Sequence, residues 1–251
     1  MGGATVEGLQ QGNTFHAEDI TVADPSQQEL ERFASSGVSL TSDNIAAAED
    51  ADIVCVVVKP WLVEPVLKGI KDTLDYQKQM LIVIAAGVSS EKIQGWLDKG
   101  DDKRIPLFLV IPNTAIAVKS SMTFIVPVCA SEAQTKVVIG IFDEVGRTII
   151  TTEHQLASGT TLASCGIAYA MRYIRAATEG GVELGFKAKE AQQIVEQTVK
   201  GAVELLQATG HHPEEEIDKV ITPGGLTIRG LNEMEHAGFT SAVIRGLKAG
   251  L

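Results

Sequence analysis

The sequence has few basic side chains and no long hydrophobic run. It contains 21 Lys and Arg against 32 Asp and Glu, which gives a formal net charge of −11. A chain with this balance and no Lys/Arg cluster lacks the basic face that nucleic acid requires. The longest apolar runs, residues 53–58 and 81–86, are too short to span a bilayer. We therefore expect neither a nucleic-acid partner nor a membrane partner.

Cysteine is also scarce. The three cysteines, Cys55, Cys129 and Cys165, are widely spaced and odd in number, which favours reduced thiols over a disulfide framework. No histidine stands beside them at zinc-ligand spacing, so we expect no metal site. Met1 is not followed by the charged and then apolar segments of a secretory signal. These features predict an acidic α/β protein of the cytoplasm.

Short apolar runs alternate with helical patterns over the first part of the chain. From about residue 152 onward the strand pattern ends and helical periodicity dominates. This order predicts a doubly wound parallel sheet in residues 1–152, followed by an all-α domain in residues 153–251. The run at residues 52–58 is typical of a strand covered on both faces. The expected strands are residues 20–23, 38–40, 52–58, 80–84, 104–111, 122–128 and 148–150.

Three groups of residues directly follow predicted strands, at the sheet edge where doubly wound proteins bind ligands. Asp24 lies about twenty residues after the N-terminal glycines, a spacing that suits a carboxylate on the ribose hydroxyls of NAD. It equally suits a turn before Pro25. The small residues 85–87 let a nicotinamide ring approach the backbone, or simply form a tight turn. The third group is residues 58–60.

The most specific string of the second half is DKVITPGGLTI, residues 218–228. Pro-Gly-Gly before an apolar helix start exposes backbone N–H groups, which form an anion site suited to a small carboxylate. Thr222 and Thr227 add hydroxyls. The chemistry alone favours the simpler interpretation, a structural loop with Thr as the helix N-cap.

Two other features have mainly structural interpretations. The small-residue stretch at 164–169 indicates close helix packing, in the core or between subunits. Cys165 has no recognisable His or Asp partner, which favours a small core residue over a nucleophile. For all five histidines we expect surface or capping roles, including His211 and His212 before Pro213.

Taken in order, these strings resemble the pyrroline-5-carboxylate reductase family across essentially the whole chain. One such motif is weak, but several in register are specific. The matching strings are VVKP at 57–60 (family AVKP), IAAGV at 84–88, IPNT at 111–114 (family MPNTP), GIAY at 166–169 (family GPAY), His212-Pro213, and TPGGLTI at 222–228 (family SPGGTTI).

The resemblance implies an NAD(P)H-binding Rossmann-like domain and a helical domain that interlocks two subunits, in dimers that often form larger rings. It implies hydride transfer to the C=N carbon of 1-pyrroline-5-carboxylate, which gives L-proline in the last biosynthetic step. Thr227 is the implied catalytic residue, beside the imine nitrogen. The implied substrate-binding residues are Val220, Thr222, Gly224, Gly225 and Thr227. The implied cofactor-binding residues are Gly2, Asp24, Asn44, Val58, Lys59, Pro60, Ala85, Ala86 and Asn113.

The sequence departs from the family at three places. Cys165 replaces a serine and Ile167 replaces a proline in the family's small-residue motif. Asp24 repels a 2′-phosphate and no arginine follows it within the turn, which favours NADH over NADPH. At the N-terminus, Met1-Gly2 matches the end of the family's Gly-x-Gly-Asn-Met-Gly. We therefore expect the first strand and the first two fingerprint glycines to be missing, which leaves strand edges unpaired at the sheet centre.

Two other functions remain open. One is a related imine or β-hydroxyacid reductase, although a hydroxyacid enzyme is expected to carry a catalytic Lys in the helical domain. The other is a dimeric scaffold without catalysis, whose cofactor binding is impaired by the missing N-terminal elements. Binding and oxidation of NADH distinguish the scaffold from an enzyme.

Overall fold

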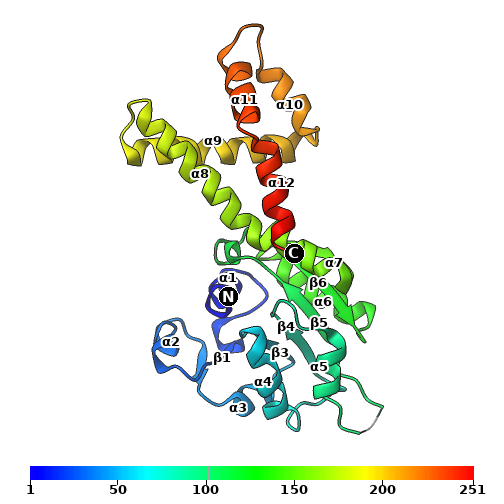
Figure 1. The fold of residues 1–251 in the computed structure, drawn as a ribbon. Helices are drawn as coiled ribbons and strands as arrows, with labels where there is room; N and C mark the ends of the chain where they lie inside the picture. Colours follow the sequence, from blue (N-terminus) through cyan, green and yellow to red (C-terminus); the bar gives the residue numbers. More distant parts are fainter. Residues whose placement is uncertain (101) are drawn as a thin grey trace. The chain divides into compact units, whose positions relative to one another are not determined.

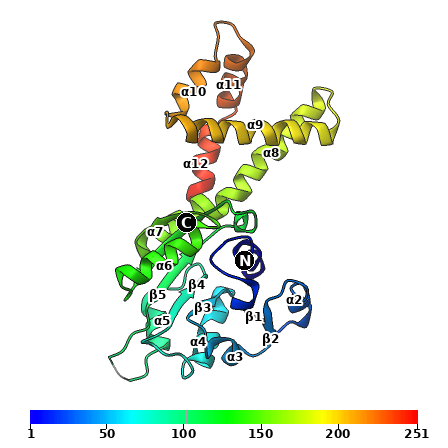
Figure 2. The same cartoon turned by 180° about the vertical axis from the view of Figure 1, so that it is seen from behind.

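The computed structural model describes residues 1–100 and 102–251 of the chain. Contacts between residues divide it into an N-terminal unit, Met1–Ser164, and a C-terminal unit, Cys165–Leu251 (Figures 1 and 2). The contacts group helix α7 (Glu153–Gly159) with the N-terminal unit. The domain boundary that we placed at residue 152 stays a prediction.

The N-terminal unit contains two sheets. Strands β1 (Thr21–Ala23) and β2 (Ser39–Thr41) form a parallel pair. The second sheet has five strands in the order β3-β4-β5-β6-β7. Their bounds are Ile53–Val56, Met80–Val83, Leu107–Ile111, Ser121–Val128 and Gly146–Ile150.

The Rossmann-like fold is confirmed, with one reversal in the sheet. Neighbouring strands run parallel except for β5 and β6, which are antiparallel. Only the short helix η3 (Thr114–Val118) connects them, and Lys119 then adopts a left-handed φ of 57°. A connection of this length cannot make the crossover that a parallel pair needs.

The two sheets are separate within the described residues, because no strand joins β1 to β3. The separation leaves β3 at the edge of its sheet, and Cys55 in β3 is exposed. The prediction that residues 52–58 are covered on both faces is therefore wrong at this position.

Helices cover both faces of the five-stranded sheet. Successive strand residues point to opposite faces, so Leu81 and Ile82 of β4 belong to different hydrophobic clusters. Helices α4 (Val63–Ile70), α5 (Ser90–Trp96) and α7 pack with the cluster of Leu81. Helices α1 (Gly2–Leu9), α6 (Glu132–Asp143) and η3 pack with the cluster of Ile82.

Serine and aspartate caps set the starts of several helices. Their side-chain oxygens accept hydrogen bonds from backbone N–H groups of the first turn. Ser131 and Gln134 form a complete capping box at α6. The other caps are Ser26 for α2 (Gln27–Glu31), Asp43 for α3 (Asn44–Ala48) and Ser89 for α5.

The C-terminal unit is entirely helical and has almost no core of its own. Of its residues, only Thr178 and Ala191 are buried. Helices α8 and α9 pack together, and Tyr173 meets Phe239 edge-on with ring centroids 6.5 Å apart. The π-helix η4 (Thr160–Cys165) precedes α8 (Gly166–Glu183), α9 (Ala188–Thr209), α10 (Pro213–Val220), α11 (Leu226–His236) and α12 (Phe239–Ala249).

No helix in the described part of the chain is both long enough and apolar enough to cross a membrane.

Candidate functional site

Most predicted cofactor residues follow the carboxyl ends of strands in the N-terminal unit. Residues 58–60 come after β3, Ala85 and Ala86 after β4, and Asn113 after β5. The carboxyl ends of parallel strands meet at one edge, so the structure brings these three groups to the same edge of the five-stranded sheet. Asp24 follows β1 in the smaller sheet, and Asn44 is the first residue of α3.

Asp24 shows the geometry of a turn residue. Its Oδ1 accepts a hydrogen bond from the Ser26 N–H at 2.8 Å, and its own N–H donates to the Thr41 carbonyl at 3.2 Å. The turn interpretation of Asp24 is therefore correct. Its contact with a ribose stays a prediction, and the side chain is only partly buried.

Asn113 is a helix cap. Its Oδ1 accepts from the Ala115 N–H at 3.0 Å, which caps η3, and its Nδ2 donates to the Ala163 carbonyl at 3.5 Å. The residue is 5% exposed. Both the oxygen and the nitrogen of the Asn113 side-chain amide are thus hydrogen-bonded within the protein. A contact of Asn113 with the cofactor stays a prediction.

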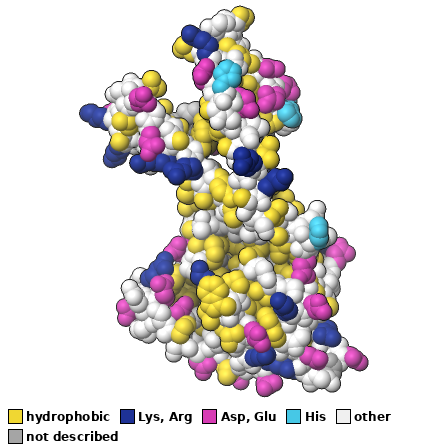
Figure 3. Space-filling view, in the orientation of Figure 1, with side chains coloured by type: hydrophobic (Ala, Val, Ile, Leu, Met, Phe, Trp, Pro, Cys, Tyr) yellow, Lys and Arg dark blue, Asp and Glu magenta, His cyan; other side chains and the backbone are white. Residues whose placement is uncertain are grey.

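The residues at this edge fit a nicotinamide dinucleotide. Ala86 and Gly87 are exposed and small, so a flat ring can approach the backbone after β4. Trp61, just after the predicted residues 58–60, is 73% exposed and adds apolar surface. Helix α1 begins at Gly2, and its contact with the cofactor stays a prediction. Figure 3 shows hydrophobic side chains exposed on this unit among charged ones.

Arg32 is a residue that the sequence analysis missed. Its guanidinium nitrogens lie 3.7 Å from where a Cβ on Gly3 would stand, in the first turn of α1. The guanidinium also pairs with Glu29 at 2.8 Å and with Glu7 at 3.5 Å. Its charge, paired with these two carboxylates, lies beside the first turn of α1, where the predicted cofactor residue Gly2 stands. Only the packing of α1 against the segment after α2 reveals this proximity.

Three of the predicted substrate residues, Thr222, Gly224 and Gly225, lie in the turn between α10 and α11, while Val220 ends α10 and Thr227 is the second residue of α11. The Gly225 N–H donates to the Thr222 carbonyl at 2.9 Å, and Gly224 has a φ of 70°. Pro223 followed by a glycine with positive φ is typical of a type II turn. Gly225 is the N-cap of α11 and has no side chain to cap it. The alternative with Thr as N-cap is therefore wrong.

The turn is open in the described chain. Thr222, Gly224 and Thr227 are exposed, and Val220 at the end of α10 is 61% exposed. No side chain caps the first N–H groups of α11, and the anion site that the sequence predicts there stays a prediction. The role of each residue in substrate binding stays a prediction.

An ion cluster joins His211, before the start of α10, to Glu216 and Lys219 within α10. Glu216 Oε1 is 2.7 Å from Lys219 Nζ and 2.6 Å from His211 Nδ1. The hydrogen bond from Lys219 lowers the pKa of Glu216, and the same bond raises the pKa of Lys219. His212 caps α10, because its Nδ1 accepts from the Glu214 N–H at 3.2 Å. The expected capping role is thus confirmed for His212.

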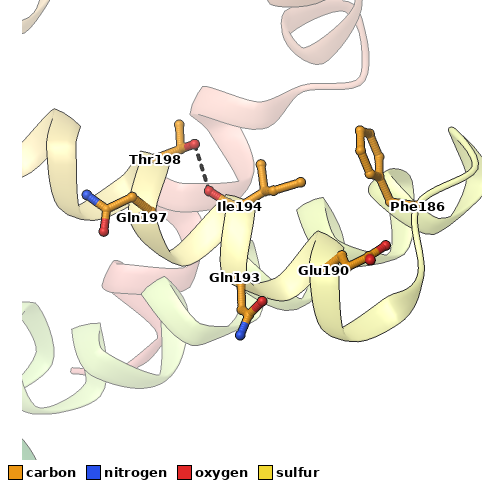
Figure 4. A pocket seen from close by; sticks show the side chains of 6 residues that line it. All are labelled: Phe186, Glu190, Gln193, Ile194, Gln197 and Thr198. Carbon is orange, nitrogen blue, oxygen red and sulfur yellow. Dashed lines mark hydrogen bonds between the residues drawn. The ribbon is translucent and has the colours of Figure 1, made fainter.

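A hollow of about 740 Å³ lies along α9, outside these predicted site residues. Figure 4 shows the residues that line it: Phe186, which precedes α9, and Ile194 with polar side chains of α9. Both apolar residues are about half exposed, at 50% and 48%. In the part of the chain that the structure describes, no group of His, Cys, Asp and Glu could hold a metal ion.

Comparisons with known proteins agree with the two units. A family model described as pyrroline-5-carboxylate reductase dimerisation matches residues 153–251. A second, described as NADP oxidoreductase, coenzyme F420-dependent, matches residues 1–87.

Similar proteins extend the agreement to the whole chain. Pyrroline-5-carboxylate reductase 2 of Dictyostelium discoideum is 33% identical over 98% of this chain and 86% of its own length. Pyrroline-5-carboxylate reductase 1 of the same organism is 37% identical over 98% of this chain, which spans only 46% of that relative. A Plasmodium falciparum pyrroline carboxylate reductase solved with NADP bound has a TM-score of 0.88, at 24% identity, over 99% of this chain and 90% of its own.

Proposed function

Because the chain belongs to the pyrroline-5-carboxylate reductase family, we propose that it reduces 1-pyrroline-5-carboxylate to L-proline with a nicotinamide cofactor. The observation that carries the proposal is the uncapped turn at Gly224 and Gly225, which offers N–H groups to a small carboxylate. The exposed small residues after β4 support the cofactor half of the reaction. Oxidation of NADH or NADPH by the purified chain on addition of pyrroline-5-carboxylate tests it.

In this proposal, residues of the turn bind the substrate carboxylate, and Thr227 transfers a proton. The Gly224 N–H, the first N–H groups of α11 after Gly225 and the hydroxyl of Thr222 hold the substrate carboxylate, with the helix dipole of α11 adding to the attraction. When bound, the reduced nicotinamide supplies the hydride that reaches the C=N carbon. Thr227, two residues after the N-cap, relays a proton to the imine nitrogen, because an iminium accepts hydride better than a neutral imine. Most of the rate gain comes from holding the reactants in contact.

Thr227→Ala is expected to lower kcat by about a hundredfold or more, in line with loss of a proton-transfer group. The dissociation constant for NADH should stay within about twofold, because the change lies away from the predicted cofactor residues. Steady-state kinetics and NADH fluorescence titration measure the two effects. Thr209→Ala is the control, since its exposed hydroxyl bonds to backbone groups away from residues 222–228: it donates to the carbonyl of Leu205 at 2.9 Å and accepts from the N–H of His211 at 3.3 Å. An unchanged kcat in Thr227→Ala removes this residue from the mechanism.

We favour NADH as the cofactor on the strength of Asp24. Asp24→Asn keeps an oxygen for the Ser26 N–H but removes the negative charge. The ratio of kcat/KM for NADPH to that for NADH should then rise by about fivefold, the effect of roughly 1 kcal/mol at a partly exposed charge. A clear NADPH preference in the unaltered protein would refute the choice of NADH, and Arg32 would then be the candidate to bind the 2′-phosphate.

The C-terminal unit supports a homodimer. Residues 165–251 bury only Thr178 and Ala191, while apolar side chains such as Leu184 stay 82% exposed. Helices with exposed apolar surface of this extent need a partner. We extend the proposal to rings of dimers, and light scattering measures the mass of the assembly. We also propose that the protein is cytoplasmic, because its three cysteines are free thiols.

A further inference from the structure

Glu153 joins the start of α7 to the start of α5. Its Oε1 accepts a hydrogen bond from the Ser90 N–H at 2.9 Å, and its Oε2 accepts one from the Ser90 hydroxyl at 2.5 Å. Hydrogen bonds to an ionised carboxylate are about twice as strong as those between neutral groups. The pair of bonds therefore fixes the backbone of Ser90 relative to α7.

Ser90 closes the loop that follows β4. At the start of this loop Ala85 is buried, in the same hydrophobic cluster as Leu156 of α7. In the middle, Ala86 and Gly87 are exposed, and a Cβ on Gly87 would meet no atom within 4 Å. Packing therefore does not hold the middle of the loop, and its position depends on how firmly the two ends are held.

The same segment of chain also contacts the loop after β5. The Ser164 hydroxyl donates to the Pro112 carbonyl at 2.9 Å, and Asn113 Nδ2 donates to the Ala163 carbonyl at 3.5 Å. The two loops at the predicted nicotinamide edge are thus both attached to residues 153–164. Among these hydrogen bonds, those of Glu153 involve a charged group, and the other two join neutral groups.

We propose that Glu153 is a positioning residue for the reductase reaction. It holds the backbone of residues 85–87 at the place where the nicotinamide ring lies, and it acts through Ser90 without touching substrate. A displacement of the ring by about 1 Å costs far more in rate than in affinity, because hydride transfer needs the reacting atoms in contact. The proposal rests on the proposed function, which supplies the ring and the reaction.

The experiment compares Glu153→Ala and Glu153→Gln with Glu132→Ala. Glu132 is the matched control, because it also is the first residue of a helix, but its carboxylate pairs only with exposed Lys136 at 2.8 Å. Without any cofactor, hydrogen exchange of the amides at residues 86–90 should accelerate about tenfold in Glu153→Ala. It should accelerate less in Glu153→Gln, whose neutral amide still meets both Ser90 groups through weaker bonds, and should stay near wild type in Glu132→Ala.

Kinetics supply the second measurement. In Glu153→Ala we expect kcat to fall about tenfold while KM for the cofactor changes less than about threefold. Wild-type exchange at residues 86–90 in Glu153→Ala overturns the proposal, as does an equal loss of kcat in Glu132→Ala. If the unaltered protein does not oxidise NADH or NADPH with pyrroline-5-carboxylate, the proposed function fails. The exchange measurement then still decides whether Glu153 holds the loop.

Discussion

Replacing Ile194 by glutamate is expected to convert the protein from a dimer to a monomer and to remove its reductase activity. Ile194 is 48% exposed on α9 and lines the hollow with Phe186. If a second subunit covers this surface, the variant buries an unpaired carboxylate, which costs about 3 kcal/mol or more. The dimer dissociation constant should rise at least about a hundredfold. Analytical ultracentrifugation measures the change.

The matched control is Lys189→Gln, which makes the same change in net charge at an exposed position of the same helix. It should remain dimeric and active. A dimeric Ile194→Glu variant with normal kcat would show that the α9 hollow faces solvent in the assembly. A monomer that keeps full activity would show that the substrate turn folds and works without a second subunit.

Gly146→Ala is expected to destabilise the N-terminal unit by more than about 3 kcal/mol. Gly146 opens β7 with a φ of 155°, and a Cβ there would stand 2.0 Å from the carbonyl oxygen of Ser121. That oxygen belongs to the backbone of β6, the strand that pairs with β7. The substitution must therefore separate two strands, and the melting temperature should fall by about 6–12 °C.

Gly140→Ala in α6 is the control for this substitution. A Cβ at Gly140 would meet no atom within 4 Å, and alanine in the interior of a helix is more favourable than glycine by about 0.5–1 kcal/mol. The control should thus melt at the same or a slightly higher temperature. A Gly146→Ala variant that melts like wild type would mean that β6 and β7 can move apart at little cost.

Local signals in the sequence predict much of this fold. Apolar runs identify β4 and β5, which are buried along most of their length. Caps such as Ser26 and Ser131 set helix starts because the bonds lie within four residues. The direction of β6 could not be read in this way, since it depends on how η3 and Lys119 turn the chain. The exposure of Cys55 depends on which strands pair, and that is a property of the whole sheet.

The sequence predicts which loops form the candidate site, but not which contacts their side chains make. The sequence identifies the loops after β3, β4 and β5 because ligands bind at that edge. It does not reveal that Asn113 Nδ2 donates to the Ala163 carbonyl or that Arg32 lies beside α1, because those contacts join segments distant in sequence. The turn at residues 222–225 shows the same limit. Pro223 and Gly224 indicate the turn, but only the geometry identifies Gly225 as the cap.

The lack of a core in the C-terminal unit makes its stability depend on protein concentration. Residues 165–251 bury too little apolar surface within one chain to offset the conformational entropy that folding removes. Most of their favourable free energy must come from the second subunit, so mass action links folding to assembly. Dilution then weakens these helices while the sheet of the N-terminal unit, with its own core clusters, keeps its stability. A single free energy of unfolding therefore does not describe this chain.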